Sequence, residues 1–212
     1  MDRGLNELLK WGIENSTTTE NDSSAGPPIN RGLDPDVLSA ILGGPSDADL
    51  MKLSMEAVLS TDPEVTLDDK LVAFDNFEQL IESLDNANNL EPLALWTPLL
   101  SCLKNEEAEI RRMAAWCVGT AVQNNEKSQE RLFAMGGIPP LVDLATREAE
   151  GEAVKRKAFY ALSSAARNYQ PAMNELVKEL NKLGKEIGSV DAADMEACDE
   201  VIAKLKEPLK TA

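Results

Sequence analysis

The sequence RRMAAWCVGTAVQNN at residues 111–125 recurs as KRKAFYALSSAARNY at residues 155–169. The two stretches align without a gap at an offset of 44 residues, which pairs Trp116 with Tyr160. A weaker third copy, KLVAFDNFEQLIES, lies upstream at residues 70–83. Repeats of this length with helical periodicity are typical of armadillo-like or HEAT-like solenoids. We therefore expect an all-α fold, in which helical repeats stack into an armadillo-like right-handed superhelix.

Outward from the repeat, apolar residues recur at helical spacing from about residue 49. Thr66 and Asp69 form the pattern of a capping box at the start of a helix over 67–84. The polar block DNANN at 85–89 is expected to end that helix. No segment shows the sustained alternation typical of a strand. Further helices are expected from about residue 50 to before Pro63 and at 91–104, 107–123, 126–135, 138–147, 155–167, 172–187 and 192–207.

Composition divides the chain into three parts. Residues 1–48 are expected to form a flexible N-terminal region, because residues 17–48 are rich in Ser, Thr, Asn, Asp, Gly and Pro. Residues 49–171 hold the repeats. Residues 172–212 are interpreted as a degenerate final repeat or cap, since terminal repeats need one polar face.

The first residues of the chain contain one amphipathic stretch. Residues 1–16 place several apolar side chains on one stripe of a short helix, with Trp11 to one side. This helix either docks on the body of the protein or recognises a partner. The residues concerned are Leu8, Leu9, Trp11 and Ile13.

Charge and composition exclude several classes of partner. The formal net charge of −16 argues against nucleic acid and against an anionic membrane surface. No apolar run suits a signal peptide or a membrane span, and the three cysteines match no zinc or disulfide pattern. We therefore expect a cytoplasmic protein in a reducing compartment.

The sequence gives little support to catalysis. Histidine is absent, which removes the commonest general base and metal ligand. Gly43-Gly44 lacks the following Lys-Ser or Lys-Thr of a phosphate-binding loop. The adjacent carboxylates at 68–69 and 106–107 stand at expected helix starts, where they complement the helix dipole. We therefore expect no enzymatic activity, no cofactor and no metal.

The functional surface is expected in the groove lined by the long helix of each repeat. Armadillo repeats commonly present a Trp and, four residues later, an Asn to this groove, whereas here Thr120 and Ser164 take the place of the Asn. This loss disfavours the holding of an extended peptide by its backbone and favours a folded partner. Trp116 and Tyr160 are interpreted equally well as core residues. Arg167 is either a solvated surface charge or a binding residue whose guanidinium pairs with a carboxylate of the partner. The predicted groove residues are Asp75, Gln79, Glu82, Trp116, Thr120, Gln123, Asn124, Tyr160, Ser164, Arg167 and Asn168.

Four stretches carry a more specific resemblance: LLKWGIENS (8–16), KLVAFDNFEQLIESLDNANNLEPLALWTPLL (70–100), GTAVQNNEKSQE (119–130) and RKAFYALSSAARN (156–168). In this order and spacing they resemble the armadillo-type nucleotide exchange factors of the cytosolic seventy-kilodalton heat-shock chaperone (DnaK type). The short fungal members are the most similar.

The resemblance implies a co-chaperone. Its concave face would bind lobe II of the chaperone's ATPase domain, open the nucleotide cleft and release ADP, so that the chaperone rebinds ATP and releases its client polypeptide. The N-terminal region would imitate an unfolded client. A monomer is expected, with neither nucleic acid nor membrane as partner. The alternative is an armadillo-type scaffold or adaptor that binds extended peptides.

Overall fold

The computed structural model describes residues 44–206, and in this range every regular element is a helix. The expected N-terminal region, with Leu8, Leu9, Trp11 and Ile13, lies outside the described residues except for its last five positions. One compact unit begins at Asp47. Its helices are α3 (Asp47–Leu59), α4 (Leu67–Ile81), α5 (Leu84–Asn89), α6 (Trp96–Cys102), α7 (Ala108–Val122), α8 (Glu126–Ala134), α9 (Ile138–Thr146), α10 (Glu152–Ala166), α11 (Gln170–Lys182) and α12 (Met195–Lys206).

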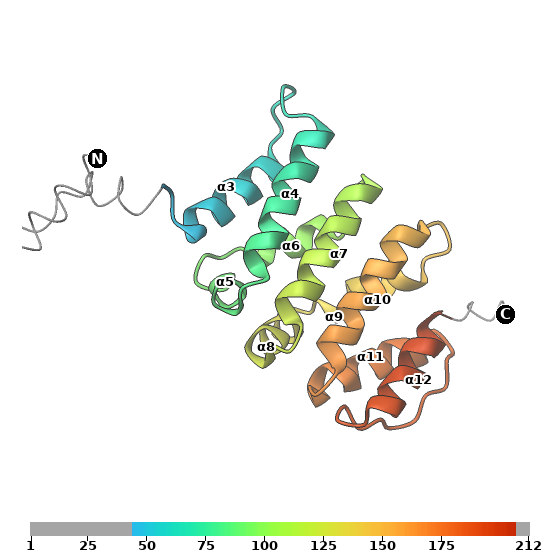
Figure 1. Cartoon of the computed structure of the whole chain (residues 1–212). Helices are drawn as coiled ribbons and strands as arrows, with labels where there is room; N and C mark the ends of the chain where they lie inside the picture. The colour runs from blue at the N-terminus through green and yellow to red at the C-terminus, as the bar shows by residue number, and fades with distance from the viewer. Residues whose placement is uncertain (1–43, 207–212) are drawn as a thin grey trace, which may run out of the picture. The chain divides into compact units, whose positions relative to one another are not determined.

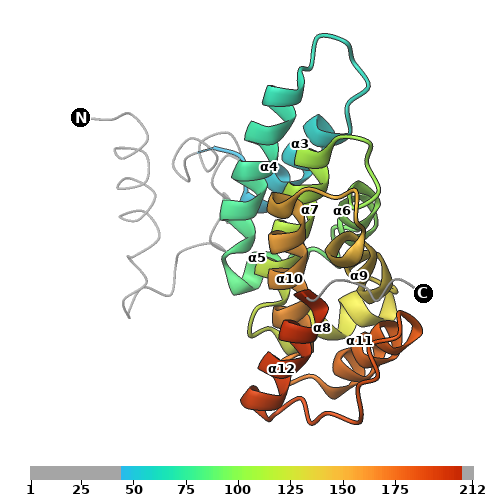
Figure 2. The same cartoon turned by 90° about the vertical axis from the view of Figure 1, so that its right-hand side faces the viewer.

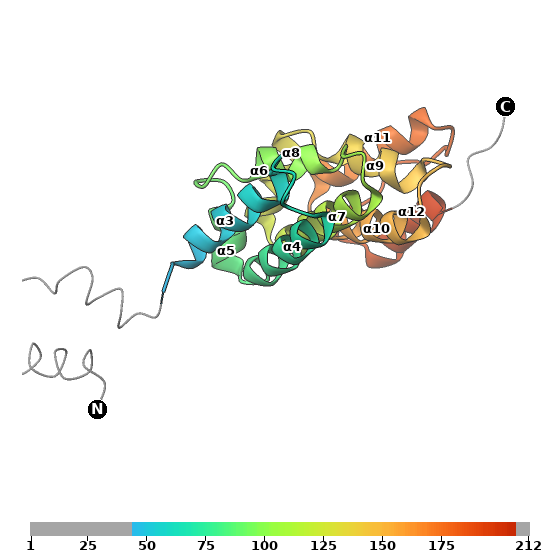
Figure 3. The same cartoon turned by 90° about the horizontal axis from the view of Figure 1, so that it is seen from above.

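The helices of this unit form two layers. The long helices α4, α7 and α10 lie side by side in one layer, with α12 beside α10 (Figures 1 and 3). Helices α3, α6, α9 and α11 form the other layer (Figure 3). The sets α5–α6–α7 and α8–α9–α10 are successive three-helix units, as in armadillo repeats. The expected all-α superhelix of helical repeats is therefore confirmed.

The C-terminal helices continue the stack. Helix α11 packs against α9 and α10, and α12 packs against both as well (Figure 2). The core residues Leu176, Leu180, Cys198 and Val201 of these helices are buried. They therefore cover the apolar edge that α9 and α10 would otherwise expose.

Small residues allow the repeat helices to approach closely. Ala114 of α7 and its equivalent Ala158 of α10 are both fully buried. Gly119 lies still closer to the next helix, since a Cβ atom there would stand 3.2 Å from the Cα atom of Ala161. The alanine-rich character of the repeat therefore produces the tight packing of α7 on α10.

The start of α4 forms as its sequence predicts. The Thr66 hydroxyl accepts a hydrogen bond from the Asp69 amide at 3.2 Å, and the Asp69 carboxylate accepts one from the Thr66 amide at 2.9 Å. This reciprocal pair satisfies two of the amide groups that a helix start leaves free. The pKa of the Asp69 carboxyl is lowered by a hydrogen bond that the Thr66 hydroxyl donates to it at 2.6 Å and by the bond from the Thr66 amide.

The polar block DNANN does not end a helix, contrary to the sequence prediction. It forms most of α5, while α4 already ends at Ile81. Asn86 is buried, and its amide donates to the Leu80 carbonyl at 2.9 Å and to the Asp47 carboxylate at 2.8 Å. These bonds tie α5 to both α3 and the end of α4, so tertiary contacts override the low helix propensity of asparagine.

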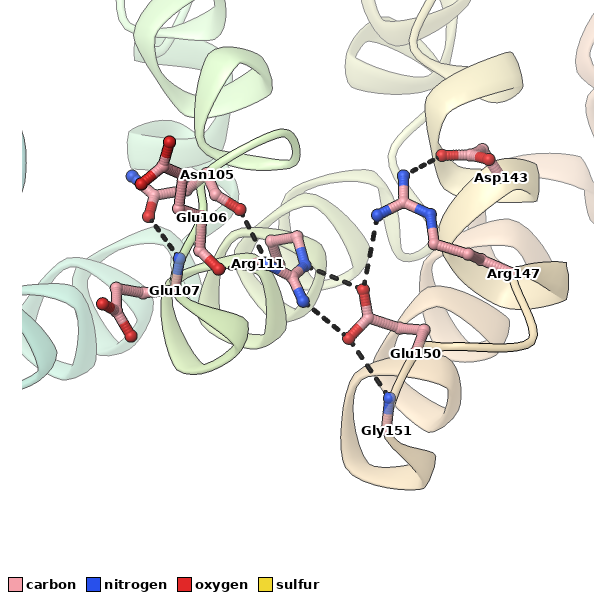
Figure 4. Close-up of polar contacts among 8 residues, drawn as sticks. All are labelled: Asn105, Glu106, Glu107, Arg111, Asp143, Arg147, Glu150 and Gly151. Carbon is pink, nitrogen blue, oxygen red and sulfur yellow. Dashed lines mark hydrogen bonds and ion pairs between the residues drawn. The ribbon is translucent and has the colours of Figure 1, made fainter.

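A buried ion pair joins the start of α7 to the loop before α10 (Figure 4). Arg111 donates to both carboxylate oxygens of Glu150 at 2.8 Å. A further guanidinium nitrogen donates to the carbonyl oxygens of Asn105 and Glu106 at 2.7 Å. The Glu150 side chain is only 1% exposed, so water does not compete for these bonds. The paired hydrogen bonds therefore form a clamp that fixes the spacing of the two repeats at one end of the layer.

Candidate functional site

A polar pocket lies between α4, α7 and α10. Its volume is about 470 Å³. Glu82 and Gln123 are the residues that end α4 and α7, so the pocket lies at the carboxyl ends of these two helices. Its lining residues are Glu78, Glu82, Trp116, Thr120, Gln123, Asn124 and Tyr160.

Hydrogen bonds between helices hold the lining side chains in place. The Thr120 hydroxyl of α7 donates to the Glu78 carboxylate of α4 at 2.6 Å. The Tyr160 hydroxyl of α10 donates to the side-chain carbonyl of Gln123 at 2.9 Å. Each helix is thus bonded to the next across the pocket, which gives the site a fixed shape.

Glu78 is a buried carboxylate at the inner end of the pocket. As a whole, this residue is only 4% exposed. Burial raises the pKa of the Glu78 carboxyl, the hydrogen bond from Thr120 opposes that rise, and the neighbouring Glu82 carboxylate adds to it. The negative charge of Glu78 is therefore only partly compensated in the free protein.

Trp116 makes a cation–π contact with Lys157 of the next repeat. The ammonium nitrogen of Lys157 lies 3.3 Å from the centroid of the Trp116 ring. Burial lowers the pKa of Lys157, and the Glu78 carboxylate opposes that change. Trp116 and Tyr160 are both half-buried, so each combines core packing with exposure to the pocket, and neither of the two interpretations excludes the other.

The structure brings together six of the eleven predicted groove residues: Glu82, Trp116, Thr120, Gln123, Asn124 and Tyr160. Asp75 and Gln79 lie outside the pocket lining, are exposed and bond to each other at 2.8 Å. Ser164 is half-buried, and its carbonyl accepts a hydrogen bond from Gln129 at 2.8 Å.

Arg167 also lies outside the pocket. Its guanidinium contacts the Asp199 carboxylate of α12 at 2.5 Å and the Ser163 hydroxyl at 2.9 Å. That Arg167 binds a partner stays a prediction, and in the free protein its side chain joins the end of α10 to α12. A partner carboxylate would have to compete with Asp199.

Asn168 has a backbone role. Its φ is +58°, in the left-handed region, and its amide donates to the Ala192 carbonyl at 2.8 Å. Asn124, its equivalent in the preceding repeat, has φ +52°. Asparagine tolerates this conformation better than most residues, which explains its recurrence at the end of both long helices.

We predict that Asn168→Ala lowers the free energy of unfolding by about 1 kcal/mol, because alanine is strained at positive φ. Asn168→Gly should retain the stability of the wild type. Urea unfolding followed by circular dichroism measures both. Equal stability of the alanine and glycine variants would show that backbone conformation does not explain this asparagine.

Glu78 and Lys157 are not among the residues predicted from the sequence. Matching Ala73 with Ala114 pairs Asp75 with Trp116 and Gln79 with Thr120, and these two positions of α4 are exposed. A signal for Glu78 was present, since Glu78 and Glu82 are four residues apart and share one helical face. Lys157 likewise precedes Tyr160 by three residues, but its equivalent in the first repeat is the buried Met113.

We predict that Glu78→Gln stabilises the protein at neutral pH. An amide still accepts the bond from Thr120 but carries no buried charge. Because the native pKa of Glu78 is raised, the native state binds protons more readily than the unfolded state. Wild-type stability therefore falls as pH rises through the window above the ordinary glutamate value. The advantage of the variant should shrink below that window, and thermal unfolding at pH 4 and pH 7.5 checks this. A variant less stable than wild type at pH 7.5 would contradict it.

The described residues offer no metal cluster or reactive thiol. Residues 44–206 contain no group of three or more Cys, Asp or Glu side chains arranged to hold a metal ion. Burial raises the pKa of Cys102 to about 11 and raises those of Cys117 and Cys198, so these thiols are protonated at neutral pH. None of the helices in the same range is long and apolar enough to cross a membrane.

The sequence matches known protein families and named relatives. Residues 5–90 match the family described as nucleotide exchange factor Fes1, and residues 86–184 match the SIL1/FES1/HPBP1 C-terminal domain. A Gibberella zeae protein named Hsp70 nucleotide exchange factor FES1 is 64% identical, over 98% of both chains. A Neurospora crassa relative named Hsp70 nucleotide exchange factor fes-1 is 51% identical over the full length of both.

More distant similarity is consistent with these matches. A Saccharomyces cerevisiae Hsp70 nucleotide exchange factor FES1 is 44% identical, over 82% of this chain and 59% of its own length. The crystal structure of an engineered protein superimposes with a TM-score of 0.55 at 19% identity, over 80% of this chain and 70% of that chain. That likeness concerns the fold alone.

Proposed function

Because the chain belongs to the Fes1 family of nucleotide exchange factors, we propose that it accelerates the release of ADP from a seventy-kilodalton heat-shock chaperone. The observation that carries this proposal is the 64% identity, over nearly the whole of both chains, to a relative named for that activity. Such a factor needs no catalytic group of its own. It acts as a binding protein.

Linkage explains how binding alone releases a nucleotide. The layer of α4, α7 and α10 binds lobe II of the chaperone's ATPase domain and favours the open cleft. A protein that binds the open, nucleotide-free state more tightly than the ADP state lowers the affinity for ADP by the same factor. ATP then enters, and the chaperone releases its client polypeptide.

Several finer points belong to the same proposal. The protein acts in the cytoplasm as a monomer, with the ATPase domain as its partner. The N-terminal region, residues 1–48, binds where a client polypeptide binds. The two repeat units supply the main contact, and α11 and α12 hold the end of the stack.

The proposal is tested by the release of a fluorescent ADP analogue from the purified chaperone ATPase domain. Excess unlabelled ATP prevents rebinding, and stopped-flow fluorescence gives the release rate. We expect the rate to rise with the concentration of this protein and to saturate. A rate that stays at its intrinsic value in a several-fold molar excess of the protein would contradict the proposal.

A further inference from the structure

The pocket between α4, α7 and α10 combines three features that favour a positive charge. Its lining contains two carboxylates, Glu78 and Glu82. Two aromatic residues, Trp116 and Tyr160, also line it, and aromatic rings attract cations. It also lies at the carboxyl ends of α4 and α7, where the helix dipole is negative.

The protein itself balances this negative potential only in part, through the charge of Lys157, which opposes the rise in the pKa of Glu78. Neither α4 nor α7 has a basic residue in its last turn. Residues 67–90 carry six acidic side chains and one basic side chain, Lys70. That lysine lies near the amino end of α4, away from Glu82, and donates to the Ser60 carbonyl at 2.7 Å. Within residues 44–206, neither Glu78 nor Glu82 has a cationic nitrogen within 4.0 Å.

Lys157 shows that Trp116 can bind an ammonium group, but Lys157 itself does not line the pocket. Its ammonium group covers the Trp116 ring at 3.3 Å and lies 6.0 Å from the Tyr160 centroid. It is absent from the pocket lining, whereas the exposed Glu82, Gln123 and Asn124 are part of it. The pocket is therefore open to solvent on the side of these three residues.

The buried carboxylate of Glu78 is unfavourable for the stability of the fold. It is 4% exposed and holds one hydrogen bond, from Thr120, while burial disfavours its charge. A buried carboxylate without a close cation destabilises a fold. A cation that enters from outside would relieve this condition, so the carboxylate acts as the inner anchor of a binding site.

We propose that this pocket receives a lysine or arginine side chain of the chaperone's ATPase domain. The alkyl part of the side chain packs between Trp116 and Tyr160, and its charged end meets Glu78 and Glu82. Gln123 and Asn124 offer carbonyl acceptors at the rim. The inference rests on the proposed function and adds to it the chemistry by which the partner is recognised.

The test measures binding of the ATPase domain to the full chain by isothermal titration calorimetry. The Glu78→Gln/Glu82→Gln variant should bind about tenfold more weakly or worse, because it removes both carboxylates from a desolvated charge contact. The same variant should be at least as stable as wild type, so weaker binding cannot be attributed to unfolding. Glu56→Gln alters net charge on the exposed surface of α3, in the other layer, and serves as the matched control for one lost charge.

Salt provides a second readout. Raising the NaCl concentration should weaken wild-type binding more steeply than binding of the double variant, since charge contacts are screened. Unchanged affinity of a folded double variant, together with an unchanged salt dependence, would overturn the cation pocket. If wild type accelerates ADP release and the double variant does so equally, only this inference fails. If wild type neither binds the ATPase domain nor releases ADP, the proposed function fails as well.

Discussion

Arg111→Ala is expected to lower the free energy of unfolding by about 3 kcal/mol, since removing one partner of a buried ion pair leaves a buried charge uncompensated. The side chains of Arg111 and Glu150 are 13% and 1% exposed, and two hydrogen bonds of 2.8 Å join them. Arg147 is 3.8 Å from the same carboxylate and replaces little of this contact. A decrease of this size should lower the melting temperature by roughly 6–12 °C in a chain of this length.

The neighbouring arginine is the matched control. Arg112 pairs with Glu109 three residues earlier on the same helix, where both side chains are considerably more exposed. Arg112→Ala should therefore change stability by only about 0.5 kcal/mol. Urea denaturation followed at 222 nm compares the two variants. Similar losses for both would show that the buried clamp has no special importance.

The effect of Arg111→Ala should depend on pH. The hydrogen bonds and charge of Arg111 lower the pKa of Glu150 from its ordinary value of 4.5, against the effect of burial. The stabilisation is therefore complete above the ordinary value and is lost as pH falls through the lowered native value. The difference between wild type and variant should be full at pH 7 and should shrink in acid. Adding Glu150→Gln to the variant should recover part of the loss at pH 7.

Gly119→Val is expected to separate α7 from α10. A Cβ at residue 119 would stand 2.5 Å from two ring carbons of Tyr160 and 3.2 Å from the Ala161 backbone. Valine adds two further methyl groups to this clash. Overpacking of this kind destabilises by about 2 kcal/mol, and β-branching in a helix adds to it. Because the Tyr160 ring is a wall of the pocket, binding of the ATPase domain should weaken as well.

Gly188→Val provides the comparison for this glycine. A Cβ at residue 188 meets no atom within 4 Å, and the residue lies in the exposed loop before α12. This substitution should leave both melting temperature and binding close to those of wild type. If Gly119→Val melts at the wild-type temperature, the close approach of α7 and α10 at this residue is not a requirement of the fold.

The repeat arrangement could be predicted because it depends on local sequence patterns that recur along the chain. The offset of 44 residues pairs Asn124 with Asn168, and both adopt positive φ at the end of a long helix. The capping box of Thr66 and Asp69 was likewise predictable, since all its atoms lie within four residues. Features of this kind depend on spacing alone and are independent of distant contacts.

The features that the sequence did not predict depend on long-range contacts. Helix α5 forms because Asn86 bonds to Asp47, 39 residues earlier. Arg111 and Glu150 are also 39 residues apart. From its sequence, the segment around Glu150 is expected only to connect two helices. The bond between Arg167 and Asp199 of α12 likewise joins residues that are 32 positions apart. Such pairings are set by how repeats stack, which the spacing of apolar residues does not specify.

The proposed function requires that this protein and ADP weaken each other's binding to the chaperone's ATPase domain. The most direct measurement determines the dissociation constant of the protein for that domain, with and without saturating ADP, by calorimetry. It also determines the constant of ADP with and without the protein. We expect each ligand to weaken the other, by the same factor in both directions. If the affinity of the protein for the domain is the same with and without ADP, the protein is not a nucleotide exchange factor.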